Sequence, residues 1–416
     1  MPHPTLTRRQ LLTAAVGTAS GLAAAGAAGW AAWLASRHRP PGTFAGLFPP
    51  ANPHVREAAF WKTACQGVQC ELCPFECFLP EGARGVCRVR MNSGGRLVTM
   101  VYDHPVSVHL DPIEKKPVFH LLPGSLIYSL AAAGCSLRCS FCQNWEISQA
   151  FPEEVVGRTS VPRELRILAV SGGMAQAQIV ADEAATLSPE EVVKAALATR
   201  CRSIAYTYSE PVVFYEYVRD IAALAKKAGL RNVMVTAGYI NPKPLAELAP
   251  LLDVVKVDLK GFDEGFYRRM VGGELKFVLR TLQELRRHHV LTEVVNLVVP
   301  TLNDDPAALK ALSAWVKQNM GPDTPLFFSR FHPQYKVQNI PPTPVETLTL
   351  ARDLAMKEGL RYVYVGNVAG HPGEHTYCPK CRQVMVRRQG YMILENRIAA
   401  TGRCPNDGTR IPGIWS

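Results

Sequence analysis

The sequence has no basic stripe interleaved with aromatic residues, and this argues against nucleic-acid binding despite a net charge of +11. Its basic residues instead flank the N-terminal segment or form short, scattered runs. Disorder is also not expected, because 47% of the 416 residues are hydrophobic and a chain of this length can bury a large core. Length alone predicts two to three folding units.

The twelve cysteines lack the setting of a secreted disulfide framework, which usually occupies a short, loop-rich chain. Spacings of two or three residues within a long sequence favour ligation of metals or clusters instead. Cys201 stands alone before an apolar run and is expected in the core. The other eleven form three groups: Cys65, Cys70, Cys73, Cys77 and Cys87; Cys135, Cys139 and Cys142; and Cys378, Cys381 and Cys404.

Charged side chains are absent from residues 10–36, an Ala- and Gly-rich stretch preceded by Arg8 and Arg9. Residues 1–36 therefore predict either a twin-arginine-type signal or a simple membrane anchor, since the stretch is long enough to cross a bilayer as a helix. No small-x-small cleavage site closes the stretch. A membrane-associated or exported location is predicted, on a side of the membrane that the flanking charges leave open. Residues 37–58, rich in Pro and Gly, are expected to form a linker.

After residue 124, short apolar runs alternate with helical patterns, which is typical of repeated βα units and a parallel sheet. N-cap residues followed by Pro mark several helix starts, at Ser188, Asp305 and Thr343. The predicted class is therefore α/β with a barrel-like order of elements. The candidate strands are Leu126–Leu130, Ser203–Thr207, Asn232–Thr236, Val254–Leu259, Glu293–Val299, Leu326–Phe331 and Tyr362–Val365.

Polar residues gather just after these runs, and in such barrels the chemistry lies at the C-terminal ends of the strands. The sequence therefore predicts one site built from several strand ends. Its candidate residues, in strand order, are Cys135, Cys139 and Cys142; Glu210; Thr236; Asp258 and Lys260; Asn303; and His332.

The loop that contains Cys135, Cys139 and Cys142 has the spacing to hold three irons of a cubane, leaving the fourth iron without a protein ligand. An open iron can chelate the amine and carboxylate of S-adenosylmethionine, so that one electron cleaves the sulfonium. Zinc is the alternative, but the loop offers no fourth ligand nearby. Phe141 is either an adenine contact or a wall of the loop.

This Cys-x3-Cys-x2-Cys loop, with an aromatic before its last cysteine, resembles the radical S-adenosylmethionine superfamily, whose fold is a partial (β/α)6 TIM-like barrel. Over about residues 60–416 the chain also resembles the AmmeMemoRadiSam-system radical enzymes, relatives of pyruvate formate-lyase activating enzymes. The motifs that carry this second resemblance are Cys70–Pro74, Asp111–His120, Cys142–Gln149, Thr207–Pro211, Val257–Phe262, Ser329–Pro333, Gly366–Gly373 and Ile411–Trp415.

The resemblance implies a [4Fe–4S] cluster and S-adenosylmethionine as cofactors, an electron donor of the flavodoxin or ferredoxin type, and an unidentified small-molecule or protein substrate. It implies that Glu210 receives the methionyl ammonium, although this carboxylate could instead cap the following helix. Asp258 and Lys260 match an Asp-x-Lys motif that reaches the methionyl carboxylate, or they form a structural salt bridge. Thr236 matches a Thr-Asn-Gly motif in which Ala replaces Asn. Asn303 and His332 are candidates for contacts with the ribose or the substrate.

Two further cysteine groups lie outside the predicted core of residues 125–370. The cysteine-rich region 59–124 carries four thiols that could bind zinc or an auxiliary cluster, or remain unligated: Cys70, Cys73, Cys77 and Cys87. Region 371–416 resembles a zinc ribbon that has lost its last cysteine, so that a weakened or empty site is expected. Its candidate ligands are Cys378, Cys381, Cys404 and Asp407.

Three functions follow from these patterns. The first is a radical enzyme that abstracts hydrogen from an unknown substrate, and the second is a glycyl-radical-enzyme activase, which the Asp-x-Lys motif favours. The third is an exported metal-binding electron carrier without catalysis. The stretch Ala150–Leu187 is unusually long for a connection and is either a lid over the barrel mouth or a surface insertion.

Overall fold

The structure is a computed structural model that describes residues 55–155, 177–178, 186–398 and 401–416. The predicted signal or anchor segment lies outside the described residues, as do most of the linker and most of the stretch Ala150–Leu187. None of the helices that the structure describes is long and apolar enough to span a membrane.

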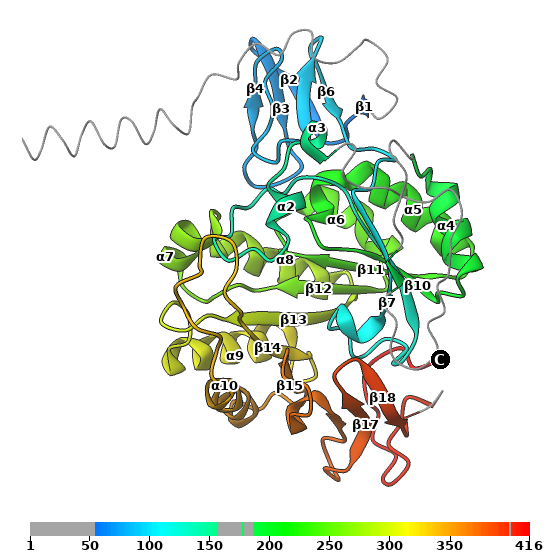
Figure 1. Cartoon of the computed structure of the whole chain (residues 1–416), viewed down its shortest axis with the longest axis vertical. Coiled ribbons are helices and arrows are strands. Elements are labelled where there is room, and N and C mark those ends of the chain that lie inside the picture. The colour runs from blue at the N-terminus through cyan, green and yellow to red at the C-terminus, as the bar shows by residue number, and fades with distance from the viewer. Residues whose placement is uncertain (1–54, 156–176, 179–185, 399–400) are drawn as a thin grey trace, which may run out of the picture. The chain divides into compact units, whose positions relative to one another are not determined.

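A nine-stranded sheet forms the centre of the molecule, in the order β15-β14-β13-β12-β11-β10-β8-β7-β9 (Figure 1). The strand β8 and the strands from β10 to β15 all run parallel, whereas β7 is added antiparallel to β8 at one edge and β9 pairs antiparallel with β7. This confirms the predicted α/β class and its partial-barrel order. The bounds are β7 Ser107–Pro112, β8 Leu126–Ala131, β9 Ala177–Gln178, β10 Ser203–Tyr206, β11 Arg231–Thr236, β12 Val254–Asp258, β13 Leu291–Val298, β14 Leu326–Arg330 and β15 Val363–Gly366.

The parallel strands are near-continuous apolar runs because the sheet is covered on both faces. All four residues of β10 are buried, for example. This is why apolar runs identified these strands in the sequence, with ends that differ from the structure by only one or two residues. Cys201, just before β10, is buried as predicted.

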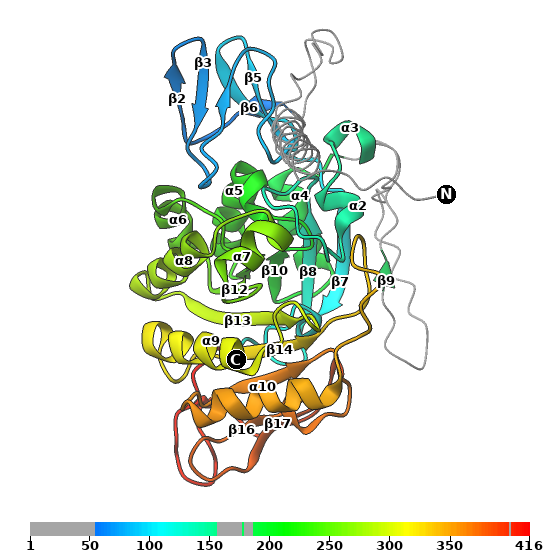
Figure 2. The same ribbon diagram turned by 90° about the vertical axis from the view of Figure 1, so that its left-hand side faces the viewer.

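Helices alternate with the parallel strands along the chain, and Figure 2 shows α6, α8 and α9 to the left of the strands and α10 in the lower foreground. Ser188 caps α4 through a capping box, and Asp305 caps α9, as the sequence predicts. The predicted Thr343 cap is wrong, because the Thr343 hydroxyl donates to the Val298 carbonyl and α10 begins after Pro344. The longer helices are α4 Pro189–Ala198, α5 Tyr215–Lys227, α6 Pro242–Leu248, α8 Leu275–Arg287, α9 Pro306–Met320 and α10 Val345–Lys357.

Short helical turns complete the connections between the strands. They are η1 Ile113–Lys115, α2 Trp145–Ser148, α3 Pro152–Val155, η2 Pro211–Phe214, η3 Ala249–Leu251, α7 Glu264–Phe266, η4 Tyr267–Val271 and η5 Pro372–Glu374.

The cysteine-rich N-terminal region folds into two small three-stranded sheets, β1-β6-β5 and β2-β3-β4. It is joined to the barrel by a buried ion pair between Arg90 and Glu216 and by an edge-to-face contact of Phe60 with Tyr215, with ring centroids 5.1 Å apart. The strands are β1 Arg56–Glu57, β2 Trp61–Ala64, β3 Gly67–Cys70, β4 Phe78–Leu79, β5 Arg90–Ser93 and β6 Arg96–Thr99.

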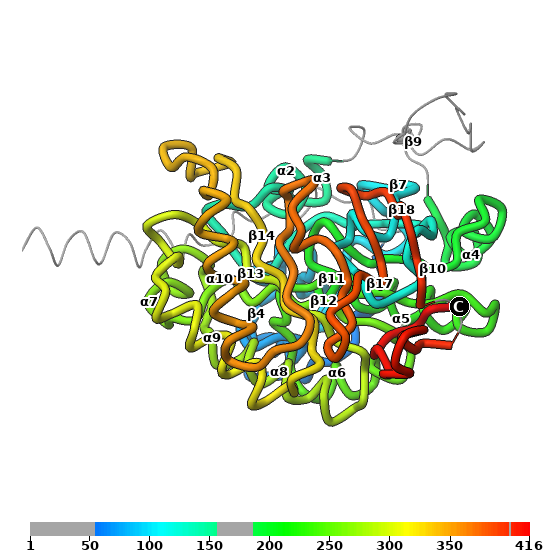
Figure 3. Tube along the Cα trace, turned by 90° about the horizontal axis from the view of Figure 1, so that it is seen from below, coloured from blue at the N-terminus to red at the C-terminus, as the bar shows by residue number. Residues whose placement is uncertain are grey.

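The C-terminal region forms a third small sheet, β16-β17-β18, which is orange to red in Figure 3. Two motifs that carried the family resemblance meet here, since the Ile414 backbone N–H donates to the His120 carbonyl at 2.8 Å. Phe119 packs within 4.9 Å of the Phe327 and Tyr364 rings. These motifs therefore have a structural role in joining the C-terminal region to the sheet. The strands are β16 Thr376–Tyr377, β17 Val384–Gln389 and β18 Met392–Asn396.

Candidate cluster and cofactor site

The three-cysteine loop follows β8 and is fixed at both of its sides. Gly134 has φ +92°, and a Cβ there would lie only 2.6 Å from the Cys87 carbonyl oxygen, so that only glycine fits. The Arg138 guanidinium donates to the Cys135 carbonyl at 2.7 Å, and the Arg138 backbone N–H donates to Val271 at 2.9 Å. The loop is thus held in place before any ligand binds.

The three thiols do not form a ligand group of single-ion size. A tetrahedral zinc ion, with Zn–S bonds of about 2.3 Å, needs its sulfur ligands about 3.8 Å apart. Among the described residues, however, only the C-terminal group places three or more ligand atoms all within 4.8 Å of one another. A cubane binds each thiolate at a separate iron and therefore spreads the thiolates farther apart. The loop of Cys135, Cys139 and Cys142 is therefore not a preformed tetrahedral zinc site, and its lack of a compact ligand set is compatible with a cubane.

Burial raises the pKa of the Cys139 thiol to about 12, and Lys260 acts in the opposite direction. Burial and then the charge of Glu210 raise the pKa of Cys135. As free thiols these side chains would keep their protons at neutral pH, so that cluster binding must displace protons. The same electrostatic couplings show that Glu210 and Lys260 lie near the cysteine loop.

Glu210 is a buried carboxylate at the end of β10, with only 2% of its surface exposed. Its Oε1 accepts from the Thr236 hydroxyl at 2.6 Å and from the Val212 N–H at 3.2 Å. Its Oε2 accepts a single hydrogen bond, from the Ala237 N–H at 2.9 Å. The predicted cap of the following helix is therefore present, and the same carboxylate is also braced by β11. Burial raises the pKa of Glu210, and a bound ammonium would oppose that shift.

Asp258 and Lys260, at the end of β12, form an ion pair. The structural salt bridge that the sequence left open for them is therefore present. The side chains are 30% and 17% exposed, and the pKa of Lys260 is raised by Asp258 against the effect of burial. The thiols of Cys139 and Cys142 act on Lys260 in the same direction. The pair therefore lies beside the cysteine loop as well as serving the fold.

For the remaining candidates, Phe141, Asn303 and His332, the structure shows no interaction that links the side chain to the cysteine thiols among the described residues. Phe141 is buried and stacks on Phe266, with centroids 6.0 Å apart, so that it forms a wall of the loop. Asn303 uses both ends of its amide on backbone groups, including the Lys260 carbonyl at 2.7 Å and the Val299 N–H at 2.6 Å. His332 is exposed at the end of β14. Contacts of these three with a cofactor or substrate stay predictions.

Asp111 and Tyr208 form a polar group beside the site. Both lie in motifs that carry the family resemblance, but the sequence predicted no role for either side chain. The Tyr208 hydroxyl donates to Asp111, whose carboxylate also pairs with Lys116 at 2.7 Å. Tyr208 has φ +64°, an uncommon conformation for a non-glycine residue, and its carbonyl accepts from Asn144 of the cysteine loop at 2.9 Å. Its signal in the sequence is the position of Tyr208, two residues before Glu210.

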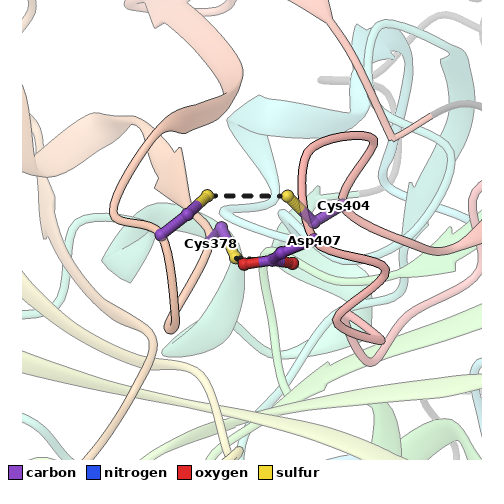
Figure 4. A group of neighbouring side chains, drawn as sticks. Cys378, Cys404 and Asp407 are labelled. Atoms are coloured by element: carbon purple, nitrogen blue, oxygen red, sulfur yellow. Dashed lines mark hydrogen bonds between the residues drawn. The ribbon is translucent and has the colours of Figure 1, made fainter.

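The C-terminal group is compact, as Figure 4 shows for Cys378, Cys404 and Asp407. The Cys381 and Cys404 sulfurs are 3.6 Å apart, and Cys378 Sγ lies 3.5 Å from Asp407 Oδ2. All four ligand atoms lie within 4.8 Å of one another. The geometry therefore suits one zinc ion with an oxygen ligand, and the expected weakening of the site by the missing cysteine stays a prediction.

Comparison with known proteins places this site in a family. The model of the "Radical SAM superfamily" matches residues 130–311. An uncharacterized protein of Methanocaldococcus jannaschii is 40% identical over 359 residues, covering 86% of this chain and 99% of that protein. Pyruvate formate-lyase 1-activating enzyme of Escherichia coli is 22% identical over 168 residues, covering 37% of this chain and 68% of that enzyme.

Solved structures include a radical SAM methyltransferase from Sphaerobacter thermophilus, with a TM-score of 0.43 and 13% identity over 64% of this chain and 71% of that one. Together, the family match over the cysteine loop and the activating-enzyme relatives give one assignment. The chain belongs to the radical S-adenosylmethionine superfamily, whose members use a [4Fe–4S] cluster and S-adenosylmethionine.

Proposed function

We propose that this chain reductively cleaves S-adenosylmethionine at a [4Fe–4S] cluster held by Cys135, Cys139 and Cys142. When bound, this cofactor pair supplies a 5′-deoxyadenosyl radical, which abstracts hydrogen from the substrate. The observation that carries the proposal is that the loop of three thiols lies beside the buried carboxylate of Glu210, whose charge acts on Cys135.

The side chains of the site would orient the cofactor and exclude water. Glu210 has one acceptor position left on Oε2, where it can receive the methionyl ammonium. Lys260 lies where it can receive the methionyl carboxylate, while Asp258 holds its ammonium in place. Phe141 and Phe266 form an apolar wall that keeps bulk water from the loop.

The substrate, donor and location complete the proposal. The motifs of the chain favour a member of the AmmeMemoRadiSam system that acts on a small molecule or a protein residue. Its electron donor would be of the flavodoxin or ferredoxin type. Residues 1–36 would direct the chain to the membrane or through it.

A second candidate function is the activation of a glycyl-radical enzyme. It is favoured by the Asp258–Lys260 motif and by the similarity to enzymes named as pyruvate formate-lyase activators. In that case the hydrogen would come from a glycine of a partner protein. The two candidates share the cofactor chemistry and differ only in the substrate.

Anaerobic turnover tests the shared step. The full chain is reconstituted with iron and sulfide, then given dithionite and S-adenosylmethionine. We expect the wild type to form 5′-deoxyadenosine and methionine in equal amounts. Cys65→Ala, which removes an exposed thiol outside the loop, should form both products as the wild type does. Cys139→Ala should give neither product. A wild-type protein that holds its cluster but forms neither product would leave only the non-catalytic electron carrier.

A further inference from the structure

Four thiols of the N-terminal region line one pocket that the proposed reaction does not use. Cys70 ends β3, Cys73 and Cys77 lie in the turn before β4, and Cys87 lies just before β5. At Gly85, between two of them, a Cβ would lie 3.6 Å from Cys87 Sγ and 3.7 Å from Cys77 Sγ. Three short connections thus place all four cysteines around the same pocket.

Their spacing distinguishes these thiols from a zinc site. No three of them lie within 4.8 Å of one another, since the C-terminal group is the only such set among the described residues. The loop of Cys135, Cys139 and Cys142 likewise forms no such compact set. Among the described residues, then, a ligand group of single-ion size coexists with two thiol groups that are not closed to that size. A cubane does not need so compact a set, because each thiolate binds its own iron.

Backbone donors to sulfur repeat a feature of the cysteine loop. In that loop the Leu137 N–H donates to Cys135 Sγ, two residues earlier, at 3.3 Å. The Val86 N–H donates to Cys77 Sγ at 3.5 Å. Such N–H···S bonds stabilise cluster thiolates and tune the potential of the cluster.

A buried cation borders the same pocket. Arg90 is 1% exposed, its guanidinium lies 3.8 Å from Cys70 Sγ, and it pairs with Glu216 on the other side. Its Nε is buried without a hydrogen-bond partner among the described residues. Glu216 already compensates this charge, and the net negative charge of four thiolates around an iron–sulfur core would be stabilised by the same buried guanidinium from the other side.

We infer that Cys70, Cys73, Cys77 and Cys87 ligate an auxiliary [4Fe–4S] cluster in which every iron has a thiolate. With no open iron, this cluster cannot bind S-adenosylmethionine, and its chemistry is confined to gaining and losing one electron. It abuts the first site, because the Arg138 side chain donates to the carbonyls of both Val86 and Cys135. The inference goes beyond the proposed function and does not depend on it.

Iron content in a variant without the first cluster tests the inference. The full chain carrying Cys135→Ala, Cys139→Ala and Cys142→Ala is reconstituted anaerobically. We expect it to hold about four irons, against about eight in the wild type. After reduction with dithionite, its electron paramagnetic resonance signal should not change when S-adenosylmethionine is added. A variant without iron would overturn the inference.

A second variant guards against misfolding. Cys77→Ser, in the triple-variant background, replaces a half-buried thiol by a smaller group and should remove the remaining iron. Cys65→Ala in the same background is the matched control and should keep it. If the wild type alone holds only about four irons, all responsive to S-adenosylmethionine, the auxiliary site is refuted. If the triple variant keeps its iron while the wild type makes no 5′-deoxyadenosine, only the proposed function fails.

Discussion

Glu210→Gln is expected to weaken S-adenosylmethionine binding while leaving the cluster in place. The substitution keeps the size of the side chain but removes the charge that would receive the methionyl ammonium. A hydrogen bond to a charged group contributes about 1.5–3 kcal/mol, and each 1.4 kcal/mol is about tenfold in affinity. We therefore expect the dissociation constant to rise roughly 10- to 150-fold.

The substitution should also cost some stability. Glu210 accepts from the Thr236 hydroxyl and the Ala237 N–H on its two oxygens, and glutamine has only one oxygen. One buried donor is then left unpaired, at a cost of about 1–3 kcal/mol. Denaturant unfolding of the wild type and the variant measures this loss.

Isothermal titration calorimetry on the reconstituted protein measures the affinity, with iron content determined on the same samples. Glu247→Gln makes the same chemical change at an exposed position on α6 and serves as the control. The reasoning is refuted if the Glu210 variant retains full iron and binds S-adenosylmethionine as tightly as the wild type.

Three further predictions concern stability and the C-terminal group. Arg90→Met leaves a buried carboxylate unpaired and should cost about 3–5 kcal/mol by denaturant unfolding, whereas Arg96→Met, which breaks an exposed pair, should cost at most about 1 kcal/mol. Asp407→Ala should weaken zinc binding at least about tenfold in competition with a chelator, and Asp407→Cys should restore it. Burial raises the pKa of Asp111, but Lys116 more than offsets this and holds it well below its usual range. The ionised carboxylate therefore stabilises the fold above about pH 4, and this contribution is lost as the pH falls further, so that Asp111→Asn should flatten the acid side of the stability profile.

The barrel could be predicted from the sequence because both of its signals are local. A parallel strand covered on both faces is an unbroken apolar run, and the spacing of Cys135, Cys139 and Cys142 is itself the motif. The convergence of Glu210 and Asp258 followed from one rule, that the carboxyl ends of parallel strands meet at one edge of the sheet.

Distances between separate segments could not be predicted in this way. Asp111 meets Tyr208 across 97 positions of sequence because β7 joins the sheet antiparallel to β8. From the sequence, the four-cysteine group of the N-terminal region was the more complete ligand set and the C-terminal group had lost a cysteine, yet among the described residues only the group of Cys378 and Asp407 closes to single-ion size. Thr343 has the local pattern of a helix cap, but the nearby Val298 carbonyl takes its hydroxyl.

The central claim is that the loop of Cys135, Cys139 and Cys142 leaves one iron open to the amine and carboxylate of S-adenosylmethionine. Pulsed electron–nuclear double resonance with cofactor labelled at the amine nitrogen tests it directly. We predict a hyperfine coupling between the label and the reduced cluster of the wild type, which Cys139→Ala abolishes. A reduced cluster in that loop with no coupling to the bound, labelled cofactor would contradict the account.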